Sequence, residues 1–108
     1  MAKYLLIESR DPFESNDTAF AYELATGLAG AGNEVTLFLV QNGVLPARNG
    51  ARADGLLAVM KAGVKVLADD FSLAERGIGN ARLRAGITPA PIETVVDHLE
   101  QGHKTLWH

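Results

Sequence analysis

Two adjacent aspartates, Asp69 and Asp70, end a short apolar run, and a serine, Ser72, follows them. Paired carboxylates can do acid/base chemistry or bind a cation, because each negative charge disfavours the ionisation of the other. Neighbouring residues of an extended chain point to opposite faces, so a simple turn is the alternative reading. Ser72 is either a nucleophile or a helix N-cap, and Glu75 three residues later completes a capping box that favours the cap.

Two arginines are candidates for holding an anionic group. Arg76 either binds an anion or pairs with one of the neighbouring acids, and structural pairing is the favoured role. Arg10 follows the first apolar run, at a strand end, and is the better candidate for an anion contact, although a solvated side chain explains it equally well. His98, His103 and His108 lack the i, i+4 spacing that would place two ligands on one helix face, so no metal site is predicted.

These residues need elements that bring them together. The β-branched run from Val64 to Leu67 predicts a buried strand before the acidic turn, and the apolar runs 3–8 and 34–40 predict two more. Ligands of an open α/β sheet collect outside the carboxyl ends of its strands. The predicted crevice at these ends comprises seven residues: Arg10, Gln41, Asn42, Asp69, Asp70, Ser72 and Arg76.

The rest of the chain alternates between helical and extended patterns. Helices are predicted after a cap at Asn16 or Asp17, over 51–62 and over 91–100, and the first helix is expected to pack Phe20 and Leu24 on the sheet. Residues 41–50 carry two Asn-Gly pairs and a proline, which predict a loop. Short strands are expected near Ile87 and over 104–107, the second with Trp107 as a packing anchor.

Composition restricts the functional class. The 108 residues suit one domain, 1–108, with 47% hydrophobic content. A net charge of -3 argues against nucleic-acid binding, which favours a basic patch. The apolar runs are too short for a membrane span or a signal-peptide core, so a cytoplasmic protein is expected. The absence of cysteine excludes thiol catalysis, and no cofactor is predicted.

The stretch 63–78, GVKVLADDFSLAERGI, resembles the active-site segment of the DsrE/DsrF-like sulfur-relay proteins. In that family a GVxV strand runs into a cysteine-bearing turn and an RGI-type ending, which Arg76, Gly77 and Ile78 match. Asp69 and Ser72 occupy the cysteine positions. The order YLLI, Asp11-Pro12, an alanine-rich helix, EVTLFLV, Gln41-Asn42-Gly43-Val44 and GHKTLW is similar to the family from end to end.

The resemblance implies a fold and an assembly. The fold is a three-layer α/β/α sandwich with a mainly parallel, about five-stranded sheet of the DsrEFH type. The assembly is a homotrimer or homohexamer in bacterial or archaeal cytoplasm. The family's persulfide chemistry needs a thiolate, which this chain lacks, so the reaction is not expected to carry over.

Two functions follow, and no catalytic residue is assigned for either. The first is a cysteine-less binding or accessory protein linked to sulfur metabolism, with a protein partner or small ligand in the crevice. The second is a small enzyme of unknown reaction, in which Asp69 is the acid or base and Arg10 or Arg76 holds an anionic substrate.

Overall fold

Five parallel strands form the centre of the protein, and the computed structural model describes residues 2–51 and 53–108. The strands follow one another in the order β4-β3-β2-β1-β5, and all four neighbouring pairs are parallel. Their bounds are β1 (Lys3–Glu8), β2 (Glu34–Leu39), β3 (Lys65–Asp69), β4 (Ile87–Ala90) and β5 (Lys104–Trp107). The five strands lie close to the positions that the apolar runs predict.

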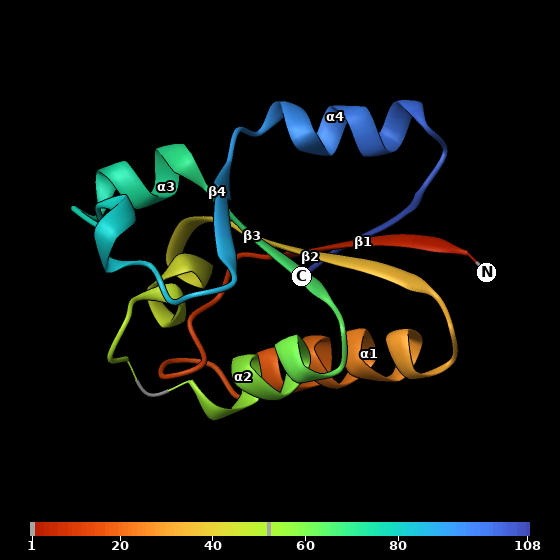
Figure 1. Cartoon of the computed structure of the whole chain (residues 1–108), viewed down its shortest axis with the longest axis horizontal. Coiled ribbons are helices and arrows are strands. Elements are labelled where there is room, and N and C mark those ends of the chain that lie inside the picture. The colour runs from red at the N-terminus through yellow and green to blue at the C-terminus, as the bar shows by residue number, and fades with distance from the viewer. Residues whose placement is uncertain (1, 52) are drawn as a thin grey trace.

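Helices cover both faces of the sheet. In Figure 1, α1 and α2 lie below the sheet, and α3 and α4 lie above it. Their bounds are α1 (Thr18–Gly30), α2 (Asp54–Lys61), α3 (Asp70–Glu75) and α4 (Glu93–Glu100). Two 3-10 helices, η1 (Gln41–Ala47) and η2 (Asn80–Arg82), complete the chain, and η1 replaces the loop expected after the second strand. The predicted α/β/α sandwich with a parallel sheet is confirmed.

The central strands bury both of their faces, as strands of a parallel sheet usually do. Leu37 and Leu39 of β2 belong to the core beneath α1 and α2, whereas Phe38 belongs to the smaller core on the other face. On β1 the same alternation places Leu6 on the α1 side and Ile7 on the opposite side. Side chains of a strand alternate between faces, so Glu8 also points to the α1 side.

Helix α1 approaches the sheet through small side chains. Ala21 and Ala25 are buried together with Tyr22, whereas Phe20 is 66% exposed. The expected packing of Phe20 on the sheet is therefore wrong, although Leu24 packs partly against the core. The alanines bring the helix close to the strands, and the bulky Phe20 ring would not fit between the helix and the sheet.

Strand β5 forms one edge of the sheet and is poorly covered. Trp107 is 65% exposed and Leu106 is 47% exposed. The predicted strand is present, but the prediction that Trp107 anchors the core is wrong, because most of its side chain lies outside the core. Among the helices described, none is long and apolar enough to cross a bilayer.

Candidate functional site

The carboxyl ends of β1, β2 and β3 lie side by side, since these three strands are neighbours and parallel. The polar side chains at these ends form two networks. One joins Asp69, Ser72, Gln41, Asn42 and Arg76, and the other lies around Glu8 and His108. Five of the seven predicted crevice residues lie on the three segments that follow these strands. Asp69 is the last residue of β3, and Arg76 is the C-cap of α3.

Asp69 caps α3 and binds Ser72. One carboxylate oxygen, Oδ2, accepts the Ser72 backbone N–H at 3.0 Å and the Ser72 hydroxyl at 2.6 Å. The N-cap is therefore Asp69, and the expectation that Ser72 is the cap of the helix is wrong. Aspartate is as good an N-cap as serine, and its position at the strand end lets the helix begin three residues earlier. Asp70 is exposed in the first turn, whereas Asp69 is buried, so the two carboxylates do not converge.

The Ser72 hydroxyl also connects β3 to the segment after β2. It accepts the backbone N–H of Gln41 at 2.8 Å. Gln41 has a φ of +52°, in the left-handed region that costs a non-glycine residue about 1 to 2 kcal/mol. The hydrogen bond to Ser72 helps to hold this conformation, and both partners of the serine hydroxyl are thus internal to the protein.

Arg76 closes the same network from the end of α3. Its guanidinium donates to Asn42 Oδ1 from Nε at 3.2 Å and from Nη2 at 3.0 Å. Nη1 donates to the Ser72 carbonyl at 3.2 Å and lies 3.7 Å from Glu75. The structural pairing predicted for Arg76 is therefore present, and it extends to Asn42 on the neighbouring segment.

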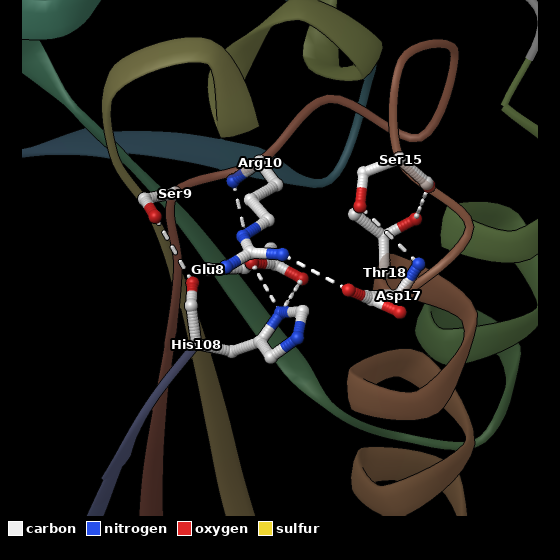
Figure 2. Close-up of polar contacts among 7 residues, drawn as sticks. All are labelled: Glu8, Ser9, Arg10, Ser15, Asp17, Thr18 and His108. Atoms are coloured by element: carbon white, nitrogen blue, oxygen red, sulfur yellow. Dashed lines mark hydrogen bonds and ion pairs between the residues drawn. The ribbon is translucent and has the colours of Figure 1, made fainter.

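Arg10 belongs to the second network, which Figure 2 shows. Its Nη1 lies 3.0 Å from Asp17 Oδ2, and both side chains are mostly exposed. Asp17 stands at the N-cap position of α1 but makes no side-chain capping hydrogen bond. The structure therefore gives Arg10 a carboxylate partner at the start of α1.

Glu8 and His108 form a buried pair that the sequence analysis did not identify. The Glu8 side chain is fully buried, and both of its oxygens lie within 2.9 Å of His108 Nδ1 (Figure 2). The Arg10 backbone N–H is a further donor, at 3.3 Å from Oε2. Buried carboxylates need such partners, because a lone charge in the interior is costly. The pair lies where β5 joins β1, at the point where the strand order reverses direction, and such a switch point commonly marks ligand sites.

The His108 backbone fixes this pair. His108 donates its N–H to the Ile7 carbonyl at 2.7 Å and accepts the Ser9 N–H and hydroxyl, each at 3.0 Å. The sequence signal for the pair was a charged residue at the end of one apolar strand and a histidine directly after another. Only the strand order shows that the two ends are neighbours.

Gly43 lets η1 pass directly over the end of β1. The Val40 N–H donates to the Glu8 carbonyl at 3.0 Å. A Cβ atom on Gly43 would overlap this same carbonyl oxygen. Residue 43 must therefore be glycine for the segment after β2 to reach the site.

Histidines also meet at the end of α4. The Nδ1 atoms of His98 and His103 lie 2.8 Å apart, so one must donate to the other. Burial lowers the pKa of His98 and the nearby charge of His103 lowers it further, which favours a neutral ring. Within the described residues no group of three or more His, Asp or Glu side chains could hold a metal ion.

The sequence matches the model of a known protein family. The model of the DsrE/DsrF-like family matches residues 2–107, nearly the whole chain. The chain belongs to the DsrE/DsrF-like family. The resemblance inferred from the central stretch is thereby confirmed. A search of curated proteins found no match.

Solved structures share the DsrE-like fold. The crystal structure of the ychN protein from E. coli superposes with a TM-score of 0.89 at 19% identity, over 100% of both chains. A protein of unknown function from Methanobacterium thermoautotrophicum, MTH1491, gives 0.85 at 13% identity, again over both whole chains. A third, BT1422 from Bacteroides thetaiotaomicron, gives 0.80 at 20% identity over 98% of this chain and 94% of its own. At these identities the likeness shows the fold alone.

Within the DsrE-like fold, this chain has a turn without cysteine. Asp69 and Ser72 hydrogen-bond to each other, and the chain has no cysteine. The side chains of Gln41 and Asn42 are exposed beside this turn. Oδ1 of Asp69 is buried and has no hydrogen-bond partner among the described residues.

Proposed function

We propose that this DsrE-like chain is a cytoplasmic binding or accessory protein linked to intracellular sulfur metabolism, and that it does not itself carry persulfide sulfur. The observation that carries the proposal is the hydrogen-bonded pair of Asp69 and Ser72 at the turn after β3. Both side chains are buried and serve to start α3. They give the turn its shape and leave it without a nucleophile.

Sulfur transfer requires a different side chain at this turn. A persulfide carrier needs a nucleophile that is largely thiolate near neutral pH and that forms a reversible S–S bond. Neither a serine hydroxyl nor a carboxylate forms such a bond. The charge of Asp69 also opposes an approaching anionic persulfide, and this repulsion is stronger in a partly closed site than in water.

The same turn supports binding. Gln41 and Asn42 are exposed beside it, and Arg76 holds Asn42 in place with two hydrogen bonds. Oδ1 of Asp69 is buried and lacks a donor, which an internal water molecule would supply. A small polar ligand or the backbone of a protein partner fits these groups.

The enzyme alternative has less support from the geometry. Arg10 and Arg76, which were to hold an anionic substrate, already have partners in Asp17 and in Asn42 and Glu75. Asp69 is the N-cap of a helix, and a change in its hydrogen bonds during a reaction would disturb α3. The binding role requires none of these groups to move.

Incubation with polysulfide tests the proposed absence of sulfur transfer. The wild-type chain should show no stable gain of about 32 Da by intact-mass spectrometry, because it has no thiol to oxidise. The variant Ala74→Cys, at an exposed position on α3, should gain that mass and serves as the positive control for an accessible thiol. A stable adduct on the wild-type chain would overturn the proposal.

We also propose that the protein is a homo-oligomer, a trimer or hexamer. Several large apolar side chains of α4 and β5 are 47 to 65% exposed, and together they leave much apolar surface in water. They are Val96 and Leu99 of α4, Ile92 at its N-cap, and Trp107 of β5. An apolar surface of this kind on a water-soluble domain commonly contacts another protein chain. A second copy covering it would also protect the free edge of β5.

Sedimentation tests the oligomer. The wild-type species should have three or six times the chain mass of 11.5 kDa. Trp107→Lys should shift it toward the monomer, because a charge placed in an apolar contact is strongly unfavourable. Phe71→Lys is the matched control, since Phe71 is 68% exposed and lies on α3 rather than on α4 or β5. A wild-type monomer at micromolar concentrations would contradict the proposal.

A further inference from the structure

A cavity of about 850 Å³ lies between α1 and α2, away from the turn after β3. Its walls are mostly apolar, and none of the seven predicted crevice residues lines it. Its lining includes Phe13, Ala19, Tyr22, Glu23, Gly55 and Ala58. We name this cavity the α1–α2 groove. Its volume falls in the range of about 300 to 1,000 Å³ that is usual for small-molecule sites.

Tyr22 gives the groove a buried polar group. The side chain is 6% exposed, and its hydroxyl has no hydrogen-bond partner among the described residues. A buried hydroxyl without a partner costs about 1 to 3 kcal/mol, so native proteins rarely keep one without a water or a ligand. The walls of the groove beside Tyr22 are mostly apolar, which suits an apolar body.

The absence of a side chain at Gly55 makes room for the Tyr22 ring. A Cβ atom on Gly55, at the start of α2, would lie 2.9 Å from Tyr22 Cδ2. Glycine inside a helix is unfavourable by about 1 kcal/mol relative to alanine. Gly55 does not have a positive φ, so its backbone conformation does not require glycine. The glycine therefore allows the ring to lie against α2. On the outer walls, Ala19 and Ala58 are exposed small residues that leave the groove open.

Negative charge surrounds the Tyr22 hydroxyl. Glu8 and Asp11 are both buried near it, and together with burial they raise the pKa of Tyr22, so the hydroxyl stays protonated and neutral. Because the hydroxyl has no hydrogen-bond partner among the described residues, its oxygen remains able to accept from a donor group. Glu23 adds a further acid on the wall, and no lysine or arginine lines the groove in residues 2–51 and 53–108.

We propose that the α1–α2 groove binds a small molecule that has a flat apolar body and a neutral or cationic hydrogen-bond donor, such as an aryl-alkyl amine. The body packs against Tyr22 between the two helices, and the donor end supplies the missing partner of the tyrosine oxygen. The surrounding carboxylates favour a cation and oppose an anion. This site is separate from the turn of Asp69 and Ser72, and it does not depend on the function proposed for that turn.

Three naphthyl probes that differ only in their polar end test the proposal. They are 1-naphthylmethylamine, 1-naphthylmethanol and 1-naphthylacetate, a cation, a neutral donor and an anion at pH 7. Backbone amide signals in a titration by NMR report both the affinity and the place of binding. The amine should bind about tenfold more tightly than the acetate, with the alcohol between them, and should shift amides of α1 and α2.

Two substitutions locate the site. Ala58→Trp fills the groove and should weaken amine binding at least about tenfold, whereas Ala74→Trp on α3 should leave it unchanged. Tyr22→Phe removes the acceptor and should weaken the amine about fivefold to tenfold. If the tryptophan variant does not fold, Ala19→Leu fills the groove from the opposite wall. Asp69→Asn should have no effect on the amine, which separates this site from the turn after β3.

The outcomes that overturn the proposal are specific. Equal binding of the acetate and the amine would remove the charge argument. Unchanged amine affinity in both groove-filling variants would show that the probe binds elsewhere. Absence of binding by all three probes at millimolar concentration would show that the groove is not a ligand site.

Discussion

Alanine in place of Gly43 should destabilise the protein by about 3 kcal/mol, one of the largest losses available from a single methyl group. The added Cβ would overlap the backbone carbonyl of Glu8, and a backbone atom cannot move aside as a flexible side chain can. To make room, η1 must rise from the end of β1, which would also weaken the hydrogen bond from Val40 to that carbonyl. Unfolding in urea followed by circular dichroism measures the loss.

Gly27→Ala is the matched control for this substitution. Gly27 lies within α1, and a Cβ atom there meets nothing within 4 Å. Alanine favours the helix, so this variant should be about 0.5 to 1 kcal/mol more stable than the wild type. A Gly43→Ala variant as stable as the wild type would mean that η1 does not pass over β1 as described.

Removal of the His108 ring should cost about 2 to 3 kcal/mol, because it leaves the Glu8 carboxylate buried with a single backbone donor. The estimate is below the range for fully buried pairs, since the His108 side chain is 29% exposed and water can reach part of the site. Chemical unfolding of His108→Ala at pH 7 measures this effect. The backbone hydrogen bonds of residue 108 are retained in the variant.

A double variant shows whether the loss comes from the unpaired charge. Glu8→Met with His108→Ala replaces the carboxylate by an apolar side chain of similar length and should be more stable than His108→Ala alone. If the double variant is instead less stable than either single variant, packing of the two side chains matters more than their charge. Ser9→Ala, which removes only the hydroxyl contact to the His108 carbonyl, should have a small effect.

The strands could be predicted from the sequence because each is a short β-branched or apolar run with a turn signal after it. Glu34–Leu39 is rich in Val, Thr, Leu and Phe. A glycine and an asparagine mark where the strand begins, and a polar pair marks where it ends. Helix faces were harder. In α1, the largest apolar residue, Phe20, is exposed, and two alanines face the sheet. Hydrophobic spacing marks a helix but does not distinguish a close-packed small face from a bulky one facing outward.

The site was predicted in its location but not in its bonding. Gln41, Asn42 and Ser72 lie at neighbouring strand ends, because consecutive parallel strands place the following segments together. Which residue caps α3 depended on where the strand stops, and such boundaries shift by one or two residues. The pairing of Glu8 with His108 could not be predicted, because the residue patterns of the two strands do not reveal that β5 lies next to β1.

That placement of β5 affects how the protein folds. Strand β1 pairs with β5, so one edge of the sheet forms through contacts between residues that are far apart in the sequence. Such contacts pay a large loop-closure entropy before they stabilise anything, and they slow folding. During synthesis on the ribosome, β1 through β4 emerge first and leave the far edge of β1 without its partner. An unpaired edge of apolar residues such as Leu5 and Ile7 is prone to join another chain. The edge of β1 therefore stays open until β5 pairs with it.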